Sequence, residues 1–146
     1  MYEQLIDLIY HGKYKEAAEI CSNFTLKELN EKILSTAYDS NNFCLYSFSL
    51  YMFTTSNKLE WLEIAVSLVI GPLCFVEGAY SIGLFHTRQL IEKELNKKNL
   101  LSLLFFYTLP EKLITTEEAL DTATKILEFD SYDQTALKII NEIKKS

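Results

Sequence analysis

The side chains best suited to acid–base or nucleophilic chemistry are few and widely spaced. His11 and His86 are the only histidines, and neither has a second histidine or a glutamate at the helical spacing that metal sites use. The sequence contains no phosphate-binding glycine loop and no nucleophile-elbow motif. We therefore expect a protein that is not an enzyme and that needs neither a cofactor nor a metal ion.

The cysteines indicate an intracellular chain. Cys21, Cys44 and Cys74 lack the spacing of a metal site, and an odd number of thiols cannot all pair. We expect them to be reduced and buried. The first residues, MYEQLIDLIY, carry two acids and no basic segment, unlike a secretory signal. The expected location is the cytoplasm.

Glu77 is the most informative acid, because it follows Gly71-Pro72 within the most apolar stretch of the chain, residues 61–85. If a helix begins near Cys74, Tyr80 lies one turn after Glu77 on the same face. Three roles for Glu77 remain open. It is a first-turn carboxylate that complements the helix dipole, a partly buried acid presented to a basic partner, or a general acid.

Charge and aromatic content predict a basic protein as the partner. The net charge is −6, and Lys58 is the only basic residue between Ile33 and Thr87. Such a surface disfavours nucleic acid and favours steering of a basic protein. Tyrosine is common at protein interfaces because it joins contact area to a polar tip. The predicted partner-binding residues are Tyr46, Trp61, Glu63, Glu77 and Tyr80.

Two other charge clusters have simpler interpretations. Glu117, Glu118 and Asp121 are typical of the solvated N-terminal turn of a helix, where acids complement the dipole. Lys97-Lys98 and Lys144-Lys145 are each expected to end a helix, where cations complement the dipole.

Composition favours an all-α fold. Four glycines and two prolines leave too few turn residues for a sheet protein. Helical spacing of apolar residues recurs along the chain. The segment 43–53 has no charge, and its periodicity does not separate helix from strand; we predict helix because no second strand exists to pair with it. The predicted helices are 2–10, 13–21, 25–38, 43–53, 59–70, 74–95, 100–107, 117–129 and one that starts at Asp130 or Ser131.

The stretch from Trp61 to Phe85 does not predict a membrane span. Its apolar run is shorter than the roughly 20 residues that a spanning helix needs. Gly71-Pro72 also interrupts it, because proline disfavours helical geometry at the preceding residue. Together with the short predicted turns, this favours about nine antiparallel helices stacked as hairpins in one domain, residues 1–146.

Both ends of the chain resemble tetratricopeptide repeats. In HGKYKEAAEIC, Gly12, Tyr14 and Ala17 match the small, aromatic and alanine positions around the turn of such a repeat. EEALDTATKILEFDSYDQTALKIINEI resembles a second helix, an Asp-Pro turn and the next first helix, with Ser131 in place of the proline. The middle departs from the repeat of about 34 residues. The resemblance implies a tetratricopeptide-like α-solenoid that is irregular in the middle.

A second resemblance concerns function. The run GPLCFVEGAYSIGLFHTR, followed by LLFFYTLPEKLITTEEA, is similar to small acidic helical immunity proteins of bacterial polymorphic-toxin and contact-dependent inhibition systems. It implies a cytoplasmic module that neutralises a cognate basic, nuclease-type toxin by binding it. The alternative is a tetratricopeptide-like adaptor or scaffold that binds peptides.

Overall fold

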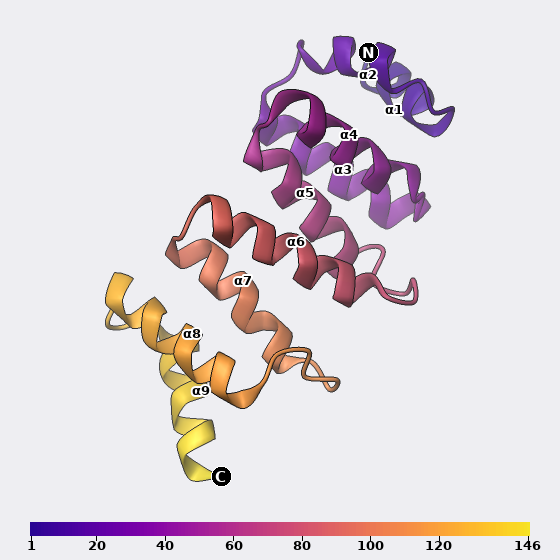
Figure 1. The fold of residues 1–146 in the computed structure, drawn as a ribbon. Helices are drawn as coiled ribbons and strands as arrows, with labels where there is room; N and C mark the ends of the chain where they lie inside the picture. Colours follow the sequence, from indigo (N-terminus) through magenta and orange to yellow (C-terminus); the bar gives the residue numbers. More distant parts are fainter. The chain divides into compact units, whose positions relative to one another are not determined.

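The computed structural model describes all 146 residues and confirms the all-α prediction (Figure 1). It contains no strand. The nine helices are α1 (Tyr2–Tyr10), α2 (Tyr14–Cys21), α3 (Leu26–Ser40), α4 (Cys44–Ser56), α5 (Leu59–Ile70), α6 (Ala79–Lys93), α7 (Lys97–Thr108), α8 (Thr116–Phe129) and α9 (Gln134–Lys145).

The chain divides into two compact units. The N-terminal unit is Met1–Gly83 and the C-terminal unit is Leu84–Ser146, so α6 runs through the boundary. Their charges differ, because the N-terminal unit has ten acidic and five basic residues, whereas the C-terminal unit has ten and nine. Almost all of the net negative charge therefore belongs to the N-terminal unit. The prediction of one domain stays a prediction.

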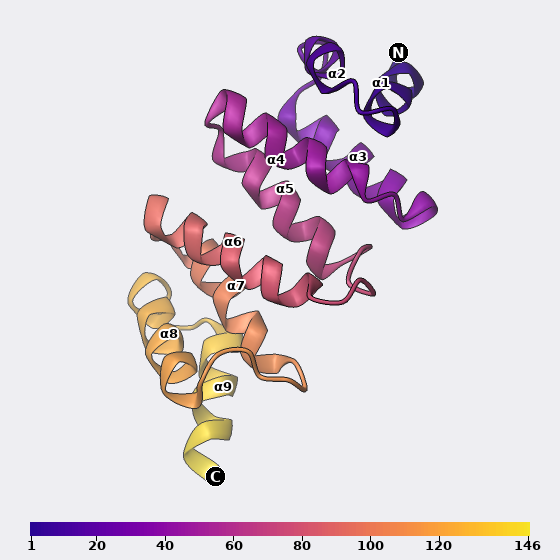
Figure 2. The ribbon, with the colours of Figure 1, turned by 45° about the vertical axis from the view of Figure 1, so that its right-hand side comes forward.

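In the N-terminal unit, α4 and α5 pack side by side (Figures 1 and 2), and half of the buried residues of the core belong to these two helices. Helix α3 packs on α5, and the α1–α2 hairpin packs on α4. Trp61 is 1% exposed and meets Phe48 edge to face, with ring centroids 5.8 Å apart. These rings add to a mostly aliphatic core, and burial of this apolar surface is the main stabilising contribution to the unit.

The charge-free segment 43–53 forms a helix, as predicted, and extends from Cys44 to Ser56. One face of α4 is core: Leu45 and Phe48 are fully buried, and Tyr46 is 8% exposed. Tyr51 is half-buried, whereas Tyr46 is more buried than its prediction as a partner-binding residue requires. Burial raises the pKa of Tyr46 above its ordinary value.

Several helix ends follow from local side-chain chemistry. Thr25 and Glu28 form a capping box before α3, in which the Glu28 amide donates to Thr25 Oγ1 at 3.1 Å. Thr115 accepts in the same way from the Glu118 amide at the start of α8. Asn41 and Asn57 end α3 and α4 with φ values of 54° and 58°. Residue type thus indicates both helix starts, whereas α3 and α4 end at Ser40 and Ser56 and not at the predicted residues 38 and 53.

Two helix starts in the C-terminal unit differ from prediction. Helix α7 begins at Lys97 because Asn96 accepts from the Asn99 amide, so the prediction that Lys97-Lys98 ends a helix is wrong. Helix α9 begins at Gln134, where Asp133 is the cap. Asp130 instead accepts from the Tyr132 amide in the preceding turn.

Lys97 joins the start of α7 to the α8–α9 turn. Its Nζ lies 2.8 Å from Asp130 Oδ2 and 3.2 Å from Asp133 Oδ2. The hydrogen bond to Asp130 raises the pKa of Lys97 and lowers the pKa of Asp130. These two carboxylates compensate a cation that the dipole at the start of α7 disfavours.

None of the nine helices is both long enough and apolar enough to cross a lipid bilayer.

In the C-terminal unit α8 packs against both α7 and α9, so consecutive helices are neighbours. The tetratricopeptide-like arrangement of the whole chain stays a prediction.

Candidate functional site

The break in the apolar stretch is a structured turn of the N-terminal unit, residues 71–78. Helix α5 ends at Ile70, and the Leu73 amide then donates to the Leu68 carbonyl at 2.9 Å. Further hydrogen bonds, which the backbone amides of Cys74 and Val76 donate, close the turn. Gly78 has φ +86°, a conformation that glycine adopts without steric cost, and α6 starts after it. The predicted start of this helix near Cys74 is therefore wrong.

Glu77 lies in this turn, before α6, and is exposed. The two interpretations of Glu77 as a first-turn helix carboxylate and as a partly buried acid are corrected, because Gly78 separates it from the helix and solvent surrounds it. Cys74 and Phe75 are also exposed, the latter at 65%. The turn thus presents an aromatic ring and a carboxylate on the surface.

Tyr38, near the end of α3, belongs to the same surface. A Cβ atom placed on Gly71 would lie 2.8 Å from the Tyr38 hydroxyl oxygen, so the tyrosine reaches the start of the turn. Its side chain is nevertheless 64% exposed. In both ribbon views the end of α3 and the 71–78 turn lie on the same side of the unit (Figures 1 and 2). We call Tyr38, Cys74, Phe75 and Glu77 the turn surface.

The structure distributes the five predicted partner-binding residues over different environments. Glu77 is on the turn surface, and Tyr80 is half-buried in the first turn of α6. Glu63 is half-buried on α5. Trp61 and Tyr46 are core residues, at 1% and 8% exposure, so in this conformation they offer almost no surface to a partner. The exposed aromatic residues Tyr38 and Phe75 are not among the five predicted residues.

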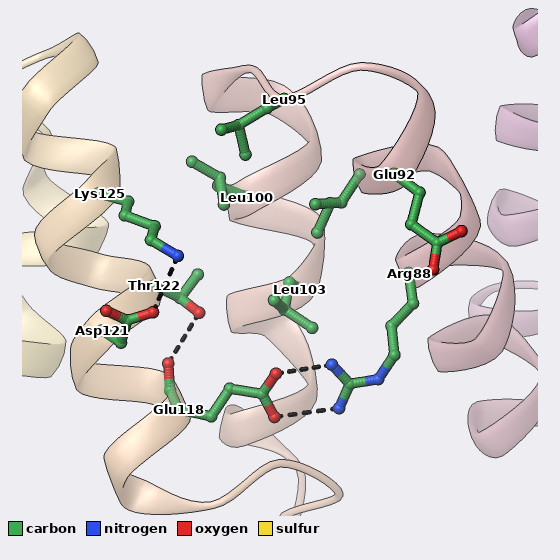
Figure 3. A pocket seen from close by; sticks show the side chains of 10 residues that line it. Arg88, Glu92, Leu95, Leu100, Leu103, Glu118, Asp121, Thr122 and Lys125 are labelled. Atoms are coloured by element: carbon green, nitrogen blue, oxygen red, sulfur yellow. Dashed lines mark hydrogen bonds and ion pairs between the residues drawn. The ribbon is translucent and has the colours of Figure 1, made fainter.

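The C-terminal unit contains a groove between α6, α7 and α8, with a volume of about 280 Å³ (Figure 3). Leu95, from the loop between α6 and α7, and two leucines of α7 line its middle, and Leu95 is 55% exposed. Figure 3 shows Arg88 and Glu92 of α6 on one side of them and the polar side chains of α8 on the other. The groove therefore joins an apolar lining to a charged rim.

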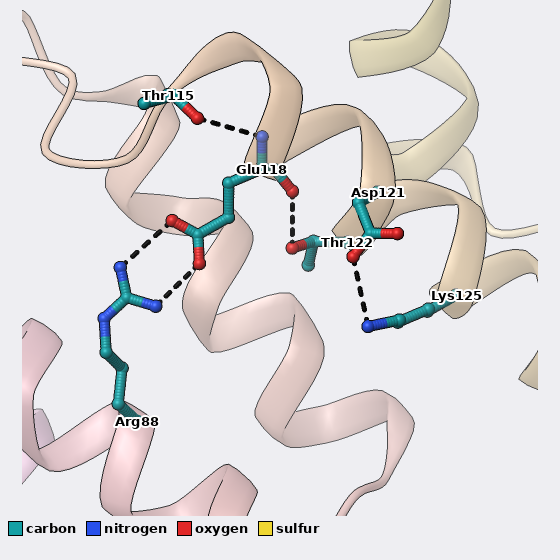
Figure 4. Close-up of polar contacts among 6 residues, drawn as sticks. All are labelled: Arg88, Thr115, Glu118, Asp121, Thr122 and Lys125. Carbon is teal, nitrogen blue, oxygen red and sulfur yellow. Dashed lines mark hydrogen bonds and ion pairs between the residues drawn. The ribbon is translucent and has the colours of Figure 1, made fainter.

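Ion pairs hold the rim of the groove (Figure 4). The Arg88 guanidinium donates to both oxygens of Glu118, at 2.6 and 3.0 Å. Lys125 Nζ lies 3.0 Å from Asp121 Oδ2, one turn away on α8. The hydrogen bond from Arg88 lowers the pKa of Glu118 below its ordinary value of 4.5 and raises the pKa of Arg88.

This pair predicts an acid-sensitive contribution to the stability of the C-terminal unit. Because the pKa of Glu118 is lower in the folded state, the contribution is complete above pH 4.5 and is lost as the pH falls through the folded pKa. We expect the urea midpoint of the chain to fall more steeply below pH 4.5 than that of Glu118→Gln. Because the pair is partly exposed, its contribution to the free energy of unfolding should be below about 1 kcal/mol. Parallel pH profiles would contradict this.

The acidic residues of the groove were recognisable in the sequence, but the groove itself was not predicted. Glu117 and Glu118 occupy the first turn of α8, as predicted, whereas Asp121 lies in the second turn; Glu118 and Asp121 also line the cavity. The spacing of Arg88 and Glu118, 30 residues apart, carries no recognisable signal. Only the packing of α6, α7 and α8 brings these residues together.

The residues with reactive side chains stand apart from one another. His86 is buried, with Nδ1 2.7 Å from Gln89 Oε1, and His11 Nδ1 lies 2.8 Å from the Asp7 carbonyl. No group of three or more His, Cys, Asp or Glu side chains is placed to hold a metal ion. Of the three free cysteines only Cys21 is buried, where burial raises its pKa to about 12, and Cys74 is exposed. The prediction that all three are buried is wrong.

Comparison with known proteins adds no relative. No family model matches the chain, and neither a curated protein nor a solved structure resembles it significantly.

Proposed function

We propose that this chain is a cytoplasmic protein-binding module that recognises a basic protein through the turn surface and acts without catalysis of its own. The observation that carries the proposal is the exposure of two large aromatic side chains, Tyr38 and Phe75, beside the exposed carboxylate of Glu77. Exposed aromatic groups of this kind are typical of protein interfaces.

Charge supports the choice of a basic partner. The N-terminal unit holds nearly all of the net negative charge, and Lys58 is the only cation between Ile33 and Thr87. A partner with a positive surface would be attracted over a distance of about 8–10 Å at physiological salt. It would meet no compensating cation on the turn itself.

The biological role that we propose is that of an immunity protein. A nuclease-type toxin needs a positive site to bind nucleic acid, since phosphate contacts dominate that affinity. An acidic protein that covers this site competes directly with the substrate. The similarity in size, acidity and segment order to immunity proteins of polymorphic-toxin and contact-dependent inhibition systems motivates this role.

Charge reversal of Glu77, on the turn surface, and of Glu63, on α5, tests the two acids that are predicted to bind the partner. The probe is a purified basic C-terminal domain of a nuclease-type toxin, co-expressed with this chain and taken first from any toxin gene beside its own gene. We expect Glu63→Lys with Glu77→Lys to slow association about tenfold or more at low salt, because steering is lost. Stopped-flow mixing at several salt concentrations measures the rate.

The matched control is Glu3→Lys with Glu19→Lys, which changes the net charge equally at two exposed positions of α1 and α2. It should slow association by less than about threefold, through net charge alone. Circular dichroism should show that both pairs of substitutions leave the fold intact. Equal rates for the two variants would exclude both Glu63 and Glu77 from the partner-binding site.

A further inference from the structure

We propose that the groove of the C-terminal unit binds a basic amphipathic segment of a protein partner, with a leucine-sized side chain in the cavity and lysine or arginine at the rim. This inference concerns a different unit from the turn surface and does not depend on the proposed immunity role. It rests on the lining of the groove, its size and the pairing of its charges.

The lining calls for an apolar side chain. Leu100 and Leu103 are almost fully buried at 2% and 6% exposure, whereas Leu95 is 55% exposed at the same cavity. Covering an exposed leucine gains roughly 25 cal/mol for each Å² removed from water. A volume of about 280 Å³ lies just below the range of about 300–1,000 Å³ that is usual for small-molecule sites. It suits a side chain better than a cofactor.

The charges at the rim favour a cationic side chain on the bound segment. Arg88 and Lys125 are the only basic residues that line the groove, and each is already bound to a carboxylate, Glu118 and Asp121 respectively. Glu92 lines the same groove, and Glu117 shares an adjoining surface depression with Glu118 and Asp121. Glu92 and Glu117 are exposed, and the ion pairs of Arg88 and Lys125 involve neither of them. The charged side chains at this site that lie outside the two ion pairs are therefore acidic.

The geometry favours a helical occupant. The leucines lie between α6 on one side and α8 on the other (Figure 3). An amphipathic helix presents apolar side chains one turn apart, with charged residues beside them. Its leucines would enter between the two helices, and its lysines would face the carboxylates along the edges.

Three synthetic peptides test the proposal with the full-length chain. The first is a blocked 12-residue helical peptide with two leucines one turn apart and flanking lysines. In the second the lysines are replaced by glutamates, and in the third the leucines are replaced by alanines. Titration is followed by amide chemical shifts of the ¹⁵N-labelled protein.

We expect saturable shifts in residues 88–103 and 117–125 with the first peptide only. Leu95→Ala should weaken its binding about fivefold, and this exposed position leaves the fold intact. Glu92→Gln with Glu117→Gln should also weaken it about fivefold, because two favourable charge contacts are lost. Glu94→Gln with Glu142→Gln, which changes two exposed acids that do not line the groove, should change it less than twofold.

Three results would overturn the proposal. One is the absence of shifts with the lysine peptide, and another is equal binding of the glutamate peptide. The third is a set of groove shifts that depend on protein concentration without peptide, since these would assign the groove to a second copy of the chain. Failure of the turn-surface variants to slow toxin binding would leave this outcome unchanged, so the two proposals fail separately.

Discussion

Replacing Trp61 with alanine should destabilise the N-terminal unit by about 3–5 kcal/mol, the largest effect expected for any single truncation in this chain. The indole is 1% exposed and packs edge to face on Phe48 between α4 and α5. Its removal leaves a cavity that two buried helices cannot fill by a small movement. Urea unfolding followed by far-ultraviolet circular dichroism measures the loss.

Trp61→Phe separates a core role from a direct contact with the partner. It keeps an aromatic ring in the core and should cost about 1–2 kcal/mol, with no change in the rate of association. A partner contact predicts the opposite pattern, with stability nearly unchanged and dissociation faster. Such a result would support the prediction that Trp61 contacts the partner.

The different locations of the aromatic residues show why the binding surface was only partly predictable. Helix α4 carries no charge and has apolar side chains on nearly every face, so its sequence does not identify which face meets solvent. Trp61 and Tyr46 were chosen for the chemistry of their side chains, and both are buried. Phe75 and Tyr38 are exposed because a turn and a helix end hold them outside the packed layers.

The helices themselves were predictable because their signals are local. The Thr25–Glu28 capping box, Thr115 and the Gly71-Pro72 break each act within a few residues, and the helix ends beside them agree closely with prediction. The start of α6 was missed because residues 74–77 have helical periodicity. The backbone hydrogen bonds of the turn and the positive φ of Gly78 outweigh this periodicity.

Gly71→Ala should destabilise the N-terminal unit by about 2 kcal/mol, because the added methyl group has no room. Its Cβ would lie 2.9 Å from the Ser67 carbonyl oxygen, which is part of the α5 backbone, and 2.8 Å from the Tyr38 hydroxyl oxygen. The carbonyl cannot move without loosening the end of α5. Trp61 is the only tryptophan, so its fluorescence during urea unfolding reports on this unit.

A double-mutant cycle with Tyr38→Ala divides this cost between the two contacts. Removal of the exposed tyrosine relieves the hydroxyl contact and should restore part of the stability of Gly71→Ala, while the carbonyl contact keeps the remainder. The control is Gly12→Ala, where a Cβ would meet nothing within 4 Å and the φ of +74° alone costs about 1 kcal/mol. Tyr38→Ala should not rescue that variant. If it rescues neither glycine substitution, Tyr38 does not rest on Gly71 in solution, and the turn surface loses its tyrosine.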